Sequence, residues 1–334
     1  MKSSASYRLK GKAQFLAVIV ALLLVFPFRT ALATYSDVPK SHPDYMAIES
    51  LTKAGIFSGY ADGSFRPEQG VNRAEAAKII LIGIGIKTEP GLYATGFPDV
   101  PLDAWYAGYV MEGMLRGILG GNPDGTFAGD RGVNTAEFLK MTLLAFKTDL
   151  SRHMSLKSSV SADVPAGQWF TPHLSYAKTV GLVFPDMEYR LYPGRFLTRA
   201  DCARVLYKQL VIHQGGETQK LLSIAEARLI EAMVMQNLNN ITSAVGYAEE
   251  AVYYAELATA VSPGSTAVQA VNKISLAFRQ LFYAYASPQN REQALSLLTE
   301  AESLAKEAVA INPTSAWLAE KISGYAATLR SQIQ

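Results

Sequence analysis

Two arginines lie in the first turn of predicted helices, where the helix itself has no use for a cation. Arg73 and Arg199 stand second in the tetrapeptides Asn72-Arg73-Ala74-Glu75 and Thr198-Arg199-Ala200-Asp201. The outer residues of each tetrapeptide predict a capping box, in which two side chains accept backbone N–H groups of the helix start. The helix dipole disfavours positive charge at this end. The cap therefore leaves both arginines unexplained, and a guanidinium is always charged and can match a carboxylate bidentately.

Removing either arginine is expected to weaken anion binding tenfold to a hundredfold, because a charge-assisted hydrogen bond is worth about 1.5–3 kcal/mol. Thermal stability should then change little. A third tetrapeptide, Asn134-Thr135-Ala136-Glu137, carries Thr135 in place of the arginine, so its unit should contribute less binding. Since an exposed first-turn position tolerates substitution, Thr135→Arg is expected to create a site at a cost of about 0.3–1 kcal/mol.

Aromatic and acidic residues near these helices are further candidates. Trp105 and Trp169 open predicted helices and could stack on a sugar ring, but a tryptophan at this place serves equally often as a packing anchor. The first unit has Pro43 at the corresponding position. Three aspartates each open an Asp-Val-Pro segment, and their carboxylates could contact a ligand or bind backbone in a turn; they are Asp37, Asp99 and Asp163.

These residues recur because the chain repeats a unit of roughly 63 residues three times. Each unit orders a turn segment, an apolar helix, a glycine loop and a second helix that begins at the tetrapeptide. In the second unit, helical spacing of apolar residues predicts the first helix from about Trp105 to Leu115, ending at Gly117. The third unit lacks the Asp-Gly turn of the other two loops, so we expect one or two competent sites rather than three.

The three units resemble the S-layer homology domain, which usually occurs as three tandem copies with a closing Thr-Arg-Ala-Glu motif. The resemblance covers about residues 35–211 and places units at 34–96, 97–160 and 161–215. It implies a mainly α fold, a pseudo-threefold prism with a central three-helix bundle and grooves between adjacent units. It also implies non-covalent binding of an acidic secondary cell-wall polysaccharide, often pyruvylated, with the motif arginine facing the anionic group.

The first 33 residues predict a secretory signal peptide. Basic residues precede an apolar run from Ala13 to about Phe28, and Ala31-Leu32-Ala33 supplies a small-x-small cleavage signal before Thr34. The alternative is an uncleaved membrane anchor, for which the apolar run is short. The sequence therefore predicts a secreted protein of the cell wall or S-layer surface, without a transmembrane span after cleavage.

Charge and motif content argue against several functions. The whole chain has a formal charge of +2, and residues 1–33 hold five Lys or Arg and no acid, which leaves 2 − 5 = −3 for the remainder. A neutral-to-acidic protein without basic runs is not expected to bind nucleic acid. The single Cys202 cannot form an intramolecular disulfide and is expected to be buried. Without a catalytic or metal-binding motif, we expect no enzyme activity and no cofactor or metal.

Residues 216–334 predict a second, helical domain. Breaks divide it into about five helices; they fall at Asn239-Asn240, Ser262-Pro263-Gly264, Ser287-Pro288 and Asn312-Pro313. Small residues recur at an offset of roughly 50 residues, a period too long for the tetratricopeptide repeat, which the segment before Pro313 resembles. An α-helical bundle and a short TPR-like helical array both suit this pattern. We expect residues 217–334 to present a surface for a protein partner or for layer assembly.

The sequence as a whole predicts a wall anchor. Its repeats would bind an acidic, pyruvylated secondary cell-wall polysaccharide, and its helical domain would interact or assemble. The alternative is an envelope tether in a two-membrane bacterium, where the repeats would bind a peptidoglycan-linked polymer. A wall-attached hydrolase built on two carboxylates is the least favoured hypothesis.

Overall fold

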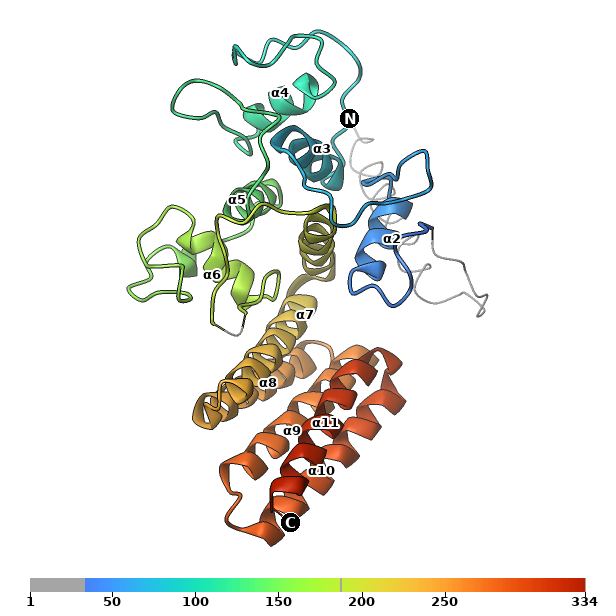
Figure 1. Cartoon of the computed structure of the whole chain (residues 1–334), viewed down its shortest axis with the longest axis vertical. Helices are drawn as coiled ribbons and strands as arrows, with labels where there is room; N and C mark the ends of the chain where they lie inside the picture. The colour runs from blue at the N-terminus through green and yellow to red at the C-terminus, as the bar shows by residue number, and fades with distance from the viewer. Residues whose placement is uncertain (1–33, 187, 334) are drawn as a thin grey trace, which may run out of the picture.

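The computed structural model describes residues 34–186 and 188–333, and this part of the chain is mainly α-helical, as predicted (Figure 1). The signal peptide predicted for residues 1–33 lies outside it. Each repeat contributes an outer helix and a closing helix: α2 (Tyr45–Lys53) with α3 (Arg73–Gly83), α4 (Ala107–Leu115) with α5 (Thr135–Ala145), and α6 (Thr171–Thr179) with the first part of α7 (Arg199–Asn237). No helix within the described ranges is both long and apolar enough to cross a membrane.

The three closing helices form the centre of the repeat region. Helices α3, α5 and α7 contact one another, as the predicted three-helix bundle requires, and the outer helices surround them (Figure 1). Each outer helix packs on the closing helix of another repeat: α2 on α7, α4 on α3, and α6 on α5. The hydrophobic core of the repeats is therefore shared, so one repeat alone cannot bury its apolar face.

A closed ring of backbone hydrogen bonds joins the three repeats next to these helices. The Val71 N–H donates to the Leu197 carbonyl (3.0 Å), that of Leu197 to Val133 (3.0 Å), and that of Val133 to Val71 (2.9 Å). All three side chains are buried. The equal lengths and cyclic order give the repeat region its pseudo-threefold character.

The capping boxes predicted for the closing helices are confirmed. Asn72, Asn134 and Thr198 each accept the N3 backbone N–H, and the acidic N3 side chain accepts the backbone N–H of the cap in all three helices. The first N–H of each helix donates to the carbonyl of another repeat, in the pairs Arg73 with Arg131, Thr135 with Arg195, and Arg199 with Gln69. The orphan donors of each helix start are thus satisfied partly by a cap and partly by a neighbouring repeat.

The predicted first helix of the second repeat is shorter than expected. Helix α4 begins at Ala107 instead of Trp105, because Trp105 lies in the turn that precedes it. Its end agrees with the sequence: Gly117 has a φ of 67° directly after the C-cap Arg116. Glycine tolerates this left-handed conformation, which closes the last helical turn.

The C-terminal part contains the five helices that the sequence predicted. Helix α7 continues out of the third repeat, interrupted by Gly216 (φ 61°, ψ −147°), and is followed by α8 (Ile241–Val261), α9 (Thr266–Ala286), α10 (Arg291–Ile311) and α11 (Ala316–Ile333). Two short 3₁₀ turns lie at Ser151–His153 and Pro313–Ser315. Consecutive helices pack together, and α9 also contacts α7 and α11. Among the described helices, α8 contacts neither α10 nor α11, so the arrangement is an open array and not a closed bundle (Figure 1).

A buried polar cluster fixes the third repeat to this array. The Lys178 ammonium lies 2.9 Å from one oxygen of Glu231, and Arg228 lies 2.7 Å from the other. Glu231 is 1% exposed. The hydroxyl groups of Tyr189 and Tyr247 are 3.3 Å apart beside this cluster. Because a buried carboxylate needs its cations, the two parts are held in one relative position.

Candidate functional site

Arg73 crosses from the first repeat to the loop of the second. Its Nε donates to the Phe127 carbonyl (3.0 Å) and its Nη2 to the Gly120 carbonyl (3.1 Å). Its Nη1 lies 3.7 Å from Glu137, and its guanidinium carbon lies 4.9 Å from the centre of the Phe127 ring. The residue is 7% exposed, and burial lowers the pKa of Arg73 against the opposing effect of Glu137. The guanidinium is therefore part of the interface between repeats.

Arg199 makes the same connection from the third repeat to the first. Its Nε donates to the Phe65 carbonyl (2.8 Å) and its Nη2 to the Ser58 carbonyl (2.7 Å). The guanidinium carbon lies 4.4 Å from the centre of the Phe65 ring. Arg199 is only partly buried, and within the described ranges no carboxylate lies within 4.0 Å of it. Of the two arginines, Arg199 is the more open to an external anion.

These contacts correct the expectation that either arginine could be removed with little effect on stability. The cap does not require a cation at either position. Each guanidinium instead donates hydrogen bonds to backbone carbonyls in the loop of a neighbouring repeat. A buried carbonyl that is left without its donor lowers the free energy of unfolding of the protein by about 1–3 kcal/mol. For Arg73, which is almost fully buried, a structural role is thus present whether or not an anion binds.

The prediction that Thr135 occupies an exposed position is wrong. The residue is 3% exposed, and its Oγ1 donates to the Arg195 carbonyl at 3.1 Å. The small cost assumed for Thr135→Arg rested on exposure, so that assumption fails as well. Thr135 makes the same kind of interrepeat bond as the two arginines, with a shorter side chain.

We expect Thr135→Ala to lower the free energy of unfolding by about 1 kcal/mol, because one interrepeat hydrogen bond is lost and little volume is removed. Urea denaturation followed by circular dichroism measures this. Thr242→Ala is the matched control, since Thr242 is solvent-exposed in helix α8 of the helical array. Equal stability of the Thr135→Ala protein and the wild type would contradict the assignment of this hydrogen bond.

The three aspartates hold the loops that the arginines bind. Each carboxylate accepts two successive backbone N–H groups at 2.7–2.9 Å: Asp37 from Phe65 and Arg66, Asp99 from Phe127 and Ala128, and Asp163 from Leu191 and Tyr192. The second residue of each pair has a left-handed φ of 59°, 53° or 52°. Such a conformation is unfavourable for a residue with a side chain. Of the two roles considered for these aspartates, the geometry favours the turn carboxylate over the ligand contact.

The two tryptophans are exposed, and each has a lysine over its ring. Trp105 is 56% and Trp169 is 52% exposed. The Lys78 ammonium lies 5.4 Å from the centre of the Trp105 ring, and the Lys140 ammonium lies 5.4 Å from that of Trp169. Each pair joins a closing helix to the next repeat, so both lie at interfaces between repeats. We call these the two Lys–Trp pairs.

The sequence interpretation missed Lys78 and Lys140. The repeat register could have identified them, since each lysine follows its tetrapeptide at the same distance on a closing helix. At the third interface the corresponding residues are Arg204 and Pro43, and the Arg204 guanidinium binds the Asp44 carboxylate at 2.6 and 2.8 Å. That interface therefore offers Arg199 but no Lys–Trp pair. The second unit, which carries Thr135 and was expected to contribute the least binding, supplies Lys140 to the pair with Trp169.

The described residues contain no cluster of three or more His, Cys, Asp and Glu side chains able to hold a metal ion. Cys202 is fully buried, as predicted, and burial raises the pKa of its thiol. The exposed groups identified at the interfaces between repeats are thus the two Lys–Trp pairs, which are cationic and aromatic. Such surfaces suit a ligand with both an apolar ring face and negative charge.

Comparison with known proteins agrees with the first two of the three predicted units. Residues 34–77 and 96–139 match the S-layer homology domain. The chain is 28% identical over 208 residues to the surface-layer 125 kDa protein of Lysinibacillus sphaericus, covering 60% of this chain and 17% of that protein. It is 27% identical over 163 residues to a cellulosome-anchoring protein of Acetivibrio thermocellus (47% and 36%) and 36% identical over 69 residues to the outer membrane protein SlpA of Thermus thermophilus (21% and 8%). The aligned region is thus well under half of each relative.

Proposed function

We propose that residues 34–215 hold this protein non-covalently to the bacterial cell envelope by binding an acidic cell-wall polysaccharide. The observation that carries the proposal is the pair of exposed tryptophans, each with a lysine over its ring, at two interfaces between repeats. The indole face can stack on the apolar face of a sugar ring, and the ammonium can pair with a carboxylate on the same sugar. A pyruvyl ketal presents its carboxylate close to the ring, as this arrangement requires.

The match to the S-layer homology domain supports attachment to the wall, as do relatives named for surface layers and cellulosome anchoring. Arg199 at the third interface is a further candidate contact, because it is partly open to solvent. Arg73 and the three aspartates are left out of the proposed contacts, since their polar atoms bind neighbouring backbone. We propose a non-catalytic anchor whose helical array, residues 217–334, faces a protein partner.

The similarity to an outer membrane protein favours one alternative. In a two-membrane envelope the same Lys–Trp pairs would bind a polymer linked to peptidoglycan, and the protein would connect an outer layer to the wall beneath. The residues involved are the same in both cases. The two functions are distinguished by testing which sacculi retain the protein, those of a bacterium with one membrane or those of a bacterium with two.

The test is co-sedimentation of residues 34–334 with purified wall sacculi, before and after extraction of the secondary polymer. We expect binding that is lost on extraction. Trp105→Ala and Trp169→Ala should each weaken binding about tenfold, the equivalent of 1.4 kcal/mol, and the double variant more. Trp317→Ala is the matched control, an exposed tryptophan of the helical array. Unchanged binding of a folded double variant would refute the proposed contacts.

A further inference from the structure

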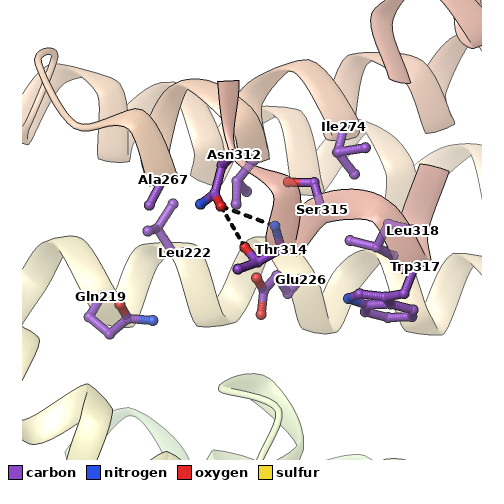
Figure 2. A pocket seen from close by; sticks show the side chains of 11 residues that line it. Gln219, Leu222, Glu226, Ala267, Ile274, Asn312, Thr314, Ser315, Trp317 and Leu318 are labelled. Atoms are coloured by element: carbon purple, nitrogen blue, oxygen red, sulfur yellow. Dashed lines mark hydrogen bonds between the residues drawn. The ribbon is translucent and has the colours of Figure 1, made fainter. Parts of the chain in front are cut away.

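The helical array has a cavity, open to solvent, that the anchoring function does not use. It has a volume of about 160 Å³ and lies between α7, α9 and the turn that leads into α11 (Figure 2). A cavity of roughly 150 Å³ accepts a molecule of the size of benzene. It is lined by Gln219, Leu222 and Glu226 of α7, by Ala267, Val271 and Ile274 of α9, and by Asn312, Thr314, Ser315, Trp317 and Leu318.

The cavity has an apolar wall and one carboxylate. Leu222, Ile274 and Leu318 are each at most 5% exposed, so their side chains belong to the interior of the array. Glu226 lines the same cavity, and Figure 2 shows it below Thr314, with Trp317 to one side. An apolar wall with a single charge binds a ligand that carries the opposite charge on an apolar stem.

Glu226 has no internal cation of its own. Within residues 34–186 and 188–333, no hydrogen bond or ion pair joins its carboxylate to another side chain. The cation that acts electrostatically on Glu226 is Lys208. Its ammonium already donates to the Gly181 carbonyl at 2.7 Å and lies over the Phe184 ring. Glu226 is solvent-exposed at the mouth of the cavity. Nearby protein atoms still desolvate its carboxyl group and raise its pKa, and the charge of Lys208 partly opposes this.

Two neighbouring groups extend the site. Thr314 donates through its N–H and its Oγ1 to the Asn312 side-chain oxygen, at 3.1 and 2.9 Å, so the lone pairs of its hydroxyl oxygen can accept further bonds. Trp317 is 47% exposed at the cavity. An ammonium has three donors and no acceptor, and an indole ring attracts it in addition.

We propose that this cavity binds an alkylammonium group of the size of a lysine side chain. The methylene stem lies along Leu222, Ile274 and Leu318, and the ammonium donates to Glu226 and Thr314. A lysine of a partner protein and a small free amine share this chemistry. The site would give the helical array a specific contact that is independent of the wall-binding repeats.

The test uses residues 34–334 with Trp105→Phe and Trp169→Phe, so that Trp317 is the remaining tryptophan and its fluorescence reports on the cavity. We expect n-butylammonium chloride to change the emission with a saturable dependence, and n-butanol at the same concentrations to have no such effect. Glu226→Gln should weaken n-butylammonium binding about tenfold. A blocked lysine amide that binds more tightly than n-butylammonium would indicate a protein source, and the reverse order would indicate a free amine.

The matched control is Glu292→Gln, an exposed glutamate in the first turn of α10 that does not line the cavity. It should bind n-butylammonium as the parent does. If Glu226→Gln fails to fold, as judged by circular dichroism, Thr314→Val supplies the second test and should weaken binding severalfold. Equal affinity of the folded variants and the parent, equal binding of n-butanol, or no saturable change in emission would each overturn the proposal.

Discussion

Arg73→Ala is expected to lower the free energy of unfolding by about 3 kcal/mol. The substitution leaves the Phe127 and Gly120 carbonyls without their donor and removes the cation beside Glu137. Loss of one partner from a buried charged pair typically destabilises a protein by about 3–5 kcal/mol, and the remaining Arg131–Glu137 pair at 2.6 Å reduces this effect. Urea denaturation of residues 34–334, followed by circular dichroism, measures the difference.

Arg152→Ala is the matched control, since Arg152 is exposed and no ion pair joins it to another described residue. It should unfold as the wild type does. Arg73→Lys should recover only part of the loss, because an ammonium cannot reach two carbonyls in the planar geometry of a guanidinium. If Arg73→Ala were as stable as Arg152→Ala, the interrepeat role of Arg73 would be refuted.

Asp163→Ala should destabilise the protein by a similar amount, again about 3 kcal/mol. Its carboxylate accepts the N–H groups of Leu191 and Tyr192 and the hydroxyl group of Ser161. Hydrogen bonds to a charged group contribute about 1.5–3 kcal/mol each, and they are not fully additive. Tyr192 must also keep its left-handed φ without this support. Asp163→Asn keeps one acceptor and should lose less stability.

The same carboxylate predicts how this stability depends on pH. Burial would raise the pKa of Asp163, but the bonds from Leu191, Ser161 and Tyr192 outweigh it, so the pKa lies below its usual value. A group with a depressed folded-state pKa contributes stability above its unfolded-state pKa of about 3.9, and this is lost as the pH falls through the folded-state pKa. The stability difference between wild type and Asp163→Ala should therefore be complete at pH 7 and shrink below about pH 4. A difference that stays constant from pH 7 to pH 3 would contradict this.

In the helical part of the chain, local sequence patterns predicted where the helices end. The breaks predicted at Asn239-Asn240 and Ser287-Pro288 are confirmed. After each break an asparagine, Asn240 or Asn290, caps the next helix through its own side chain. The sequence left a closed bundle and an open array as alternatives, since the same small residues suit both. The tertiary contacts distinguish them, because among the described helices α8 contacts neither α10 nor α11.

The sequence by itself determined the features that depend on a few neighbouring residues. The capping boxes at Asn72 and Asn134, the helix end at Gly117 and the threefold order of the units all follow from short-range chemistry or from repetition. The tertiary structure decided the roles of the site residues. Arg73 meets Phe127 across 54 residues of chain, and Arg199 meets Phe65 across 134. Because each outer helix packs on another repeat, the partners of Arg73, the burial of Thr135 and the two Lys–Trp pairs exist only once all three repeats have assembled.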